Sequence, residues 1–469
     1  MGSERILFVP VLAVVLAGCA VGPNYKAPET SVSPAFAHGS QPGLSTNAPA
    51  VFWWRSFNDA TLDSLIDTAI STNIDLRIAT ANLREARALR RLANFDFGPT
   101  ITAGAGYANQ RLGSVTLPPG VPRDVEIYDA GFDATWELDI FGRVRRSTEA
   151  ARAQVQAAEA ARREVLISVI AEVARNYFDL RGTQNQLYVA KRNATNQSET
   201  LRITQLRLEG GRGTQLDVAR AQAQLSSTLA IVPPLEAEIA RVIHRLSVLT
   251  GRQPGALLER LSRATPMPNA PELVALGDPT QLLRRRPDVR VAERDLHAAT
   301  ARIGVATADL FPRVTFIGRI GVEAETFSGL TQAGSDTWSF GPRITWAALD
   351  IGRVQARIQA AGARAEGQLA NYERTVLGAL EETENALVEW GRVQARHDYL
   401  RQSVQSSEEA VTLARERYDA GAADFLNVLD AERVLLEGQN QLAASQTRTA
   451  TALVAVYKAL GAGWEFENK

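Results

Sequence analysis

The stretch Trp136-Glu137-Leu138-Asp139-Ile140-Phe141-Gly142-Arg143 has a counterpart 210 residues later, Trp346-Ala347-Ala348-Leu349-Asp350-Ile351-Gly352-Arg353. The same offset relates identical residues further along: Glu172 and Glu382, Arg207 and Arg417, Gly211 and Gly421, Leu216 and Leu426, Gly251 and Gly461. A constant offset means that neither copy has gained or lost residues, as elements of fixed length require. The unit is longer than the roughly 20–50 residues of a solenoid repeat. The sequence therefore predicts two tandem strand-and-helix repeats.

Two alternating segments precede each copy of this motif, and they predict β-hairpins over 100–137 and 313–347. Their apolar faces are Ile101, Ala103, Ala105, Tyr107, Tyr128, Ala130, Phe132, Ala134 and Trp136 in the first, and Val314, Phe316, Gly318, Ile320, Trp338, Phe340, Ile344 and Trp346 in the second. Each segment has about the length that a tilted strand needs to cross a bilayer. A soluble hairpin with one half-buried face alternates in the same way, so alternation alone leaves both readings open.

A very long helix is predicted after each motif, over 143–208 and 353–418. The first contains no proline, and a seam of mostly leucine recurs at every seventh residue: Leu166, Val173, Leu180, Leu187, Ala194, Leu201 and Leu208. This is the spacing of a coiled coil. At 1.5 Å per residue, about 66 residues make a rod of roughly 100 Å, some three times the hydrocarbon thickness of a membrane. The second seam is less regular, because Thr383 and His397 occupy two of its positions.

Tight turns and returning helices complete each repeat. The first repeat, 58–250, is predicted to contain a helix from 58 to about 94, the hairpin, the long helix and a return helix over 214–250. Pro233-Pro234 must kink or break that return helix. The second repeat, 287–461, ends with a return helix over 424–460. A Pro-rich, irregular linker over 251–286 separates the repeats, and a tail covers 462–469.

The only cysteine, Cys19, follows a short apolar run and the residues Leu16-Ala17-Gly18. This Leu-Ala-Gly-Cys sequence resembles a bacterial lipobox. It predicts a signal peptide over 1–18, acylation of Cys19 and an extended, lipidated tether over 19–57. The alternative is a plain signal peptide with an incidental cysteine. Ala20, rather than an aspartate, follows the cysteine, as in sorting to the outer membrane.

Composition excludes several classes of function. The 51 basic and 52 acidic residues nearly balance, so nothing indicates a nucleic-acid partner. The histidines are scattered without the spacing of metal ligands: His38, His244, His297 and His397. Met267 is the only methionine besides Met1, so no soft-metal cluster is present. We expect no enzymatic activity, no cofactor and no metal site.

Four strands cannot close a barrel, and open sheet edges are not tolerated in lipid. Three chains would supply twelve strands and so an even-numbered wall. The predicted fold is therefore mainly α with a small membrane β-barrel: a trimeric 12-stranded barrel continuous with a long α-helical barrel. The narrow apolar seams and polar remaining faces of the long helices favour a hollow wall over a solid bundle.

These residues resemble the TolC-like outer membrane factors, and among them the lipoprotein branch of the OprM and NodT type. The resemblance covers 16–464 and rests on five motifs in order: Val21-Gly22-Pro23-Asn24-Tyr25, Trp53-Trp54-Arg55-Ser56-Phe57, Glu137-Leu138-Asp139-Ile140-Phe141-Gly142-Arg143, Leu283-Arg284-Arg285-Arg286-Pro287-Asp288-Val289 and Asp309-Leu310-Phe311-Pro312. Asp350-Ile351-Gly352 departs from the family's usual Asp-Gly-Gly and concerns only the joint between strand and helix.

The resemblance implies a homotrimeric exit duct, lipid-anchored in the cell outer membrane with a periplasmic extension. Its implied partners are outer membrane lipids, a periplasmic adaptor and an inner-membrane RND-type transporter, and its cargo would be small molecules such as drugs. Exit of secreted proteins in a type I system is the alternative within this class. A lipid-anchored periplasmic coiled-coil adaptor and a standalone diffusion porin are alternatives from other classes.

A duct of this kind needs a closable end, and the free end lies at the helical turns. Leu426 and Asp430 are four residues apart on the last helix and share a face. The family's periplasmic constriction falls at this leucine and aspartate, which predicts an apolar ring and a carboxylate ring. The alternative is that Leu426 packs between helices and that Asp430 pairs with Arg433. Asp217 and Arg220 lie near the same level in the first repeat, and a role in ion pairs that hold the tip shut is predicted for them.

The turns themselves are predicted to dock the adaptor, because small residues permit close approach of another backbone. The residues concerned are Gly210, Gly211, Gly213 and Thr214 in the first turn, and Gly421, Ala422 and Asp424 in the second. The alternative is that glycine merely permits the turn. A phosphate-binding loop at Gly210–Gly213 is disfavoured, because the segment follows a helix and not a strand.

Overall fold

The computed structural model describes residues 20–30, 32–40, 43–47, 50–113, 115, 118, 120, 122–271 and 273–465. The predicted signal peptide, Cys19 and residues 466–469 of the predicted tail lie outside the described residues. Within these ranges the two halves of the chain have the same succession of helices, two strands, one very long helix and a helical return. No helix of the described ranges is long and apolar enough to span a lipid bilayer.

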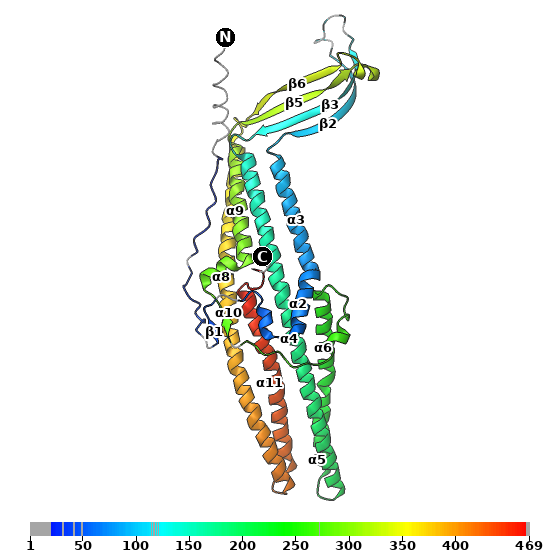
Figure 1. Cartoon of the computed structure of the whole chain (residues 1–469), viewed down its shortest axis with the longest axis vertical. Helices are drawn as coiled ribbons and strands as arrows, with labels where there is room; N and C mark the ends of the chain where they lie inside the picture. The colour runs from blue at the N-terminus through cyan, green and yellow to red at the C-terminus, as the bar shows by residue number, and fades with distance from the viewer. Residues whose placement is uncertain are drawn as a thin grey trace. The chain divides into compact units, whose positions relative to one another are not determined.

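The elements of the two halves correspond closely (Figure 1). The first half contains α2 (Ala60–Thr72), α3 (Ile74–Phe95), β2 (Thr100–Arg111), β3 (Asp124–Leu138), α4 (Arg143–Glu209), α5 (Gln215–Ala230) and α6 (Val232–Leu249). The second half contains α8 (Pro279–Arg285), α9 (Pro287–Ala308), β5 (Arg313–Ala324), β6 (Asp336–Thr345), α10 (Ile351–Asp419) and α11 (Phe425–Ala459). Short elements lie between them: β1 (Leu44–Ser45), η1 (Trp53–Phe57), α7 (Leu258–Leu261), β4 (Val274–Ala275) and η2 (Phe327–Thr331).

Two expectations about local structure need correction, and a third agrees with the structure. The helix predicted from 58 to 94 is two helices, because Asn73 is extended and its side chain accepts from the Leu76 N–H that starts α3. As predicted, the first return helix is broken at the prolines: it is divided into α5 and α6, and Pro233-Pro234 lie in the first turn of α6, where a backbone N–H would have no partner within the helix. The linker predicted to be irregular contains α7, β4 and α8, and the tether predicted to be extended contains η1 and β1, which pairs in parallel with β4.

Two compact units share the chain. Unit 1 comprises 1–29, 82–159 and 291–374, and unit 2 comprises 30–81, 160–290 and 375–469. The helices α3, α4, α9 and α10 each contribute residues to both.

Unit 1 contains an antiparallel sheet of order β2-β3-β5-β6, so β2 and β6 form its edges. One row of apolar partners crosses all four strands: Ala103, Phe132, Ile320 and Trp338. The adjacent row is polar: Thr102, Asp133, Arg319 and Ser339. Phe132, Ile320 and Trp338 are 58%, 64% and 68% exposed, so no described part of the chain covers these side chains.

The start of the described chain is held against the helices of unit 1. The Val21 N–H donates to the Phe141 carbonyl (3.1 Å), and Arg146 donates back to the Val21 carbonyl (3.1 Å). The ring of Tyr25 stacks on His297 of α9 with centroids 4.2 Å apart. The first described residues of the predicted tether are therefore fixed against unit 1.

Unit 2 contains the main apolar core, which is built around η1. Trp53 and Trp54 are 1% and 0% exposed. Trp53 stacks on Tyr457 of α11 with centroids 4.8 Å apart, and Phe57 packs against Phe178 of α4. Residues of α2, α6 and α10 complete the cluster.

The predicted seam of α4 lies inside the protein: Leu166, Val173, Leu180, Ala194 and Leu201 are at most 8% exposed. The seam of α10 is buried as well, at Val376, Thr383, Trp390, Val404 and Val411. Thr383 is tolerated there because its hydroxyl donates to the Ala379 carbonyl one turn earlier (2.8 Å). The second rod is therefore packed as continuously as the first, despite its less regular sequence.

Candidate functional site

The two helical turns of unit 2 share one backbone conformation. In the first, the Arg212 N–H donates to the Arg207 carbonyl (2.8 Å) and Gly211 has φ +72°. In the second, the Ala422 N–H donates to the Arg417 carbonyl (2.8 Å) and Gly421 has φ +71°. Both are Schellman turns, in which the residue after the helix takes a left-handed conformation that favours glycine. A Cβ on Gly211 or Gly421 would meet no atom within 4 Å, so the glycines serve the backbone and leave the outer surface of each turn open.

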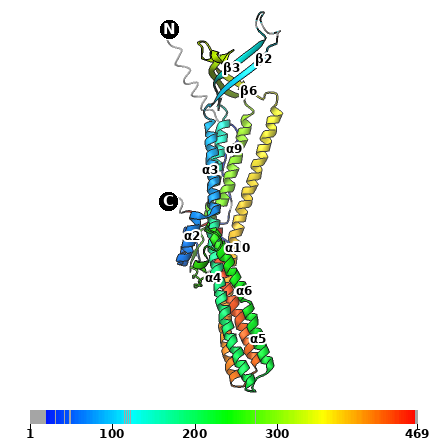
Figure 2. The ribbon, with the colours of Figure 1, turned by 90° about the vertical axis from the view of Figure 1, so that its right-hand side faces the viewer.

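The turns lie at one end of unit 2 (Figures 1 and 2). Arg207, in the last turn of α4, reaches Asp419, in the last turn of α10, with Nη2 and Oδ1 2.8 Å apart. Its guanidinium also lies 4.1 Å from the centroid of the Tyr418 ring. This one arginine therefore joins the ends of the two long helices.

Next to these contacts, on the side away from the turns, a small apolar cluster joins four helices. Leu201 of α4, Ala221 of α5, and Phe425 and Val428 of α11 are at most 8% exposed, and Tyr418 of α10 packs beside them. The cluster excludes water from the inside of the tip, so the helices there form one packed group.

An ion pair with one buried partner adjoins this cluster. The guanidinium of Arg415 donates to Glu432 Oε1 (2.6 Å), and Thr200 of α4 donates to the same oxygen (3.3 Å). The Glu432 side chain is only 7% exposed, and its Oε2 has no partner among the described atoms. Removing a carboxylate from water is costly unless it is paired, and Arg415 supplies that pairing for Glu432.

The predicted gate residues lie on the exposed side of α11. Leu426 is 52% exposed, so it does not pack between helices of its own chain. Asp430 accepts from Arg433 (2.9 Å), and this hydrogen bond raises the pKa of Arg433 above its ordinary value. The predicted pairing with Arg433 is therefore present, but both side chains remain mostly exposed.

Asp217 has a partner within its own chain that the sequence analysis did not identify. Asp217 forms a capping box with Thr214, in which its N–H donates to the Thr214 hydroxyl (3.2 Å) and its carboxylate accepts from the Thr214 N–H (3.2 Å). In the described part of the chain neither Asp217 nor Arg220 forms an ion pair. Within one chain they do not hold the tip shut; instead, Asp217 caps α5.

The sequence analysis did not predict the two ion pairs that join the helices at the tip, Arg207 with Asp419 and Arg415 with Glu432. Their partners lie 212 and 17 residues apart, and only the packing of the helices brings them together. The conservation of Arg207 as Arg417 between the repeats was the one available signal.

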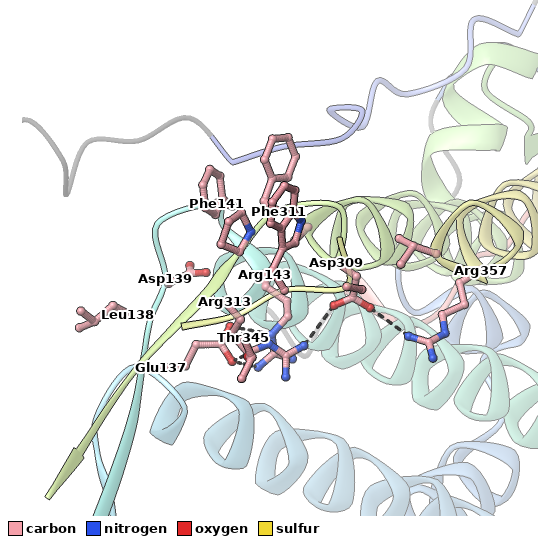
Figure 3. A pocket seen from close by; sticks show the side chains of 15 residues that line it. Glu137, Leu138, Asp139, Phe141, Arg143, Asp309, Phe311, Arg313, Thr345 and Arg357 are labelled. Carbon is pink, nitrogen blue, oxygen red and sulfur yellow. Dashed lines mark hydrogen bonds and ion pairs between the residues drawn. The ribbon is translucent and has the colours of Figure 1, made fainter. Parts of the chain in front are cut away.

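A second group of charged side chains occurs in unit 1, where the strands meet the helices. Arg143 donates to Glu137 (2.7 Å), and this hydrogen bond raises the pKa of Arg143. Arg313 lies 3.7 Å from Glu137 and 3.1 Å from Asp309, and Arg357 lies 3.6 Å from Asp309. The side chains form an alternating row along a pocket of about 290 Å³ (Figure 3).

Neither group has the composition of a metal centre. Among the described residues no three histidines or carboxylates are grouped so as to hold a metal ion. The tip is a packed end with an open outer surface. The place where the strands meet the helices of unit 1 carries a row of fixed charges.

The chain is similar to known proteins along most of its length. The family model described as outer membrane efflux protein matches residues 65–252 and 279–462. Nodulation protein T of Rhizobium leguminosarum bv. trifolii is 31% identical over 462 residues, covering 97% of both chains. The toluene efflux pump outer membrane protein TtgI of Pseudomonas putida is 31% identical and covers 97% of this chain and 98% of its own. The structure of the outer-membrane channel OprN superposes with a TM-score of 0.90 at 41% identity, covering 95% of this chain and 100% of that one.

Proposed function

We propose a trimeric channel for this chain on the premise that it belongs to the outer membrane efflux protein family. The protein is an outer membrane efflux channel, with a mainly helical fold and a smaller sheet. In the proposed trimer, three four-stranded sheets close one barrel in the membrane, and the long helices form a tube that extends into the periplasm. The uncovered sheet, with an exposed apolar face and two unpaired edges, is the observation that carries the proposal.

The sheet is incomplete by itself. Its apolar rows suit lipid and its polar rows suit water, but β2 and β6 each leave a row of backbone groups unpaired. In lipid each such group costs several kcal/mol, so the edges of neighbouring chains must pair. Gly131 and Gly321 face each other on β3 and β5, and a Cβ on either would lie within 2.6 Å of backbone, which suits a strongly curved wall.

The helices of unit 1 support the same neighbour relation. Figure 2 shows α3 and α10 on the two outer sides of the unit, with α4 and α9 between them. The part of α10 in unit 1 contains glycines, and a Cβ on Gly362 or Gly367 would meet no atom within 4 Å. A glycine inside a helix costs about 1 kcal/mol relative to alanine, so some gain must offset it. On α3, Leu89 and Leu92 are 54% and 62% exposed. We propose that these leucines pack on the small residues of α10 in the next chain.

Gly367→Leu tests this interface. The new side chain has room within its own chain and raises helix propensity, so the monomer should fold, but it should block the neighbour. We expect the detergent-solubilised mass to fall from three chains to one, measured by light scattering. Gly367→Ala is the matched control and should remain trimeric. A wild-type protein that conducts ions as a monomer would contradict the trimer.

We further propose that Leu426 and Asp430 form the periplasmic gate. Both are exposed in the single chain and share a face of α11. Three copies around an axis would therefore give an apolar ring next to the turns and, one helical turn further from them, a ring of carboxylates. Arg220 occupies the position in the first repeat that Asp430 occupies in the second, and Asp217 lies one turn earlier. We propose that these two residues act at the same level between chains.

Replacing Leu426 and Asp430 together by alanine should raise single-channel conductance in planar bilayers, because the blocking ring is removed. Leu229→Ala is the control, since Leu229 is a comparably exposed leucine (49%) on α5. An equal conductance of the double variant and the wild type would remove Leu426 and Asp430 from the gate.

The open outer surfaces of the turns are the proposed docking site for a periplasmic adaptor, which would connect the channel to an inner-membrane RND-type transporter. We propose small molecules as cargo, an acylated Cys19 as membrane anchor, and no catalytic activity in the chain itself. Deleting the gene and measuring retention of a fluorescent efflux substrate tests the pathway. Retention that is equal in the deletion strain, the complemented strain and the wild type would contradict it.

A further inference from the structure

The polar face of the sheet changes its charge along the strands. Far from the helices it carries three acids and one base: Asp129, Asp133, Glu323 and Arg319. Nearer the helices, register places Glu137, Thr315 and Arg343 in one row, with Arg313 at the end of β5. The same face is thus acidic at one end and basic at the other.

The strand–helix joint strengthens the basic end. Arg143 and Arg357 join Arg313 around Glu137 and Asp309, as Figure 3 shows. Two further arginines of the joint are each balanced by an aspartate, Arg145 by Asp139 and Arg353 by Asp350. Four arginines remain, Arg143, Arg313, Arg343 and Arg357. The acids near them are Glu137 and Asp309, which pair with three of the four, and Asp96, which acts on Arg143 from a distance. Each chain therefore contributes one uncompensated positive charge.

This excess lies on accessible side chains. Arg357 is 58% exposed and approaches Asp309 only to 3.6 Å. Arg343 is exposed, and within the described ranges no ion pair includes it. By contrast, Arg143 is mostly covered and engaged with Glu137, so it ties β3 to the start of α4. Arg343 and Arg357 can therefore act on a passing solute while Arg143 holds the frame.

We propose that Arg143, Arg313, Arg343 and Arg357 form an arginine belt around the lumen of the assembled channel, which favours anionic over cationic solutes at this level. The inference rests on the trimer proposed above, in which the polar face of the sheet lines the water-filled lumen. Like charges arranged around an aqueous passage raise the local concentration of their counter-ions. Three copies place three uncompensated charges at one level.

The belt can be tested by ion selectivity in planar bilayers. Under a KCl gradient at about 0.1 M, where the Debye length is about 10 Å, we expect Arg343→Gln to lower the chloride-to-potassium permeability ratio about two-fold. Adding Arg357→Gln should lower it further. Arg343→Lys keeps the charge and should keep the ratio. At about 1 M salt the Debye length falls to about 3 Å, so the difference between variants should disappear.

The outcomes separate the belt from the channel. Channels of normal conductance whose selectivity is unchanged in Arg343→Gln with Arg357→Gln would overturn the belt and leave the trimer intact. A shift of equal size in Arg343→Lys would also overturn it, because the effect would then not depend on charge. Absence of any channel from wild-type protein would instead reject the proposed function.

Discussion

The turn after α4 and the turn after α10 have the same backbone, but the helices that follow them are held in different ways. In the first, Thr214 and Asp217 cap α5 with reciprocal hydrogen bonds. In the second, Asp424 stands at the cap position of α11 and its side chain makes no capping hydrogen bond. Instead, Phe425 is 4% exposed, whereas its counterpart in the first repeat, Gln215, is exposed.

The difference separates a locally stabilised turn from one stabilised by its neighbours. A capping box acts within four residues and is present however the surrounding helices move. The start of α11 depends on Leu201 of α4, Ala221 of α5 and Arg415 of α10, which pairs with Glu432 of α11. The second turn should therefore respond more strongly to any change in helix packing, which suits the end of the chain that carries the proposed gate.

Phe425→Ala should have the largest effect on this contrast. Removing a buried phenylalanine typically costs about 3–5 kcal/mol, and here the loss falls on the contact between α11, α4 and α5. Amide hydrogen exchange should accelerate throughout the second turn and the start of α11. Gln215→Ala, at the equivalent exposed position, should leave exchange in the first turn nearly unchanged. Equal acceleration in both variants would remove the distinction.

Alanine in place of Gly211 or Gly421 should have an intermediate effect that is the same in both turns. Each glycine has a left-handed φ, which costs a residue with a Cβ roughly 1–2 kcal/mol, and neither site offers a steric reason for a difference. Thermal unfolding of the two single variants should show similar shifts. Gly210→Ala is the control, because Gly210 does not have a positive φ. A much larger loss at Gly421 would mean that the second turn is strained beyond its backbone.

Thr214→Ala should destabilise the first turn by about 1 kcal/mol, because the Asp217 N–H loses its side-chain acceptor and keeps only the Thr214 carbonyl. Asp424→Ala should cost less, since no side-chain cap is lost and only the favourable position of a carboxylate near a helix N-terminus is removed. Denaturant unfolding of both variants measures the two losses. If Asp424→Ala proved the more costly, the second turn would also be held by its cap.

Local patterns predicted much of the fold. The seven-residue spacing from Leu166 to Leu208 indicated a buried seam because a helix presents such positions along one side. The alternation around Phe132 and Trp338 indicated which strand residues share a face, since side chains alternate along any strand. Leu426 and Asp430 were found from their spacing together with the family resemblance, and their roles remain predictions.

Other features depended on partners that no local pattern identifies. That β3 pairs with β5, which joins the two hairpins into one sheet, is a contact between segments almost 200 residues apart. Two further contacts also join segments that are distant in the sequence: the hydrogen bond from Arg146 to the Val21 carbonyl, and the ion pair of Arg207 with Asp419. Asp217 was assigned to an ion pair because its charge was visible in the sequence, whereas its hydrogen bond to Thr214 required the backbone of the turn.

By itself, the sequence determined the lengths, faces and order of the repeated elements, because each follows from residue spacing within one helix or hairpin. Only the tertiary structure decided which charges meet at the joint and the tip, because a side chain's electrostatic partner depends on where distant segments lie. The reason is physical: backbone periodicity acts over a few residues, while ion pairs and buried clusters form across whatever surfaces the packed helices bring within a few ångströms.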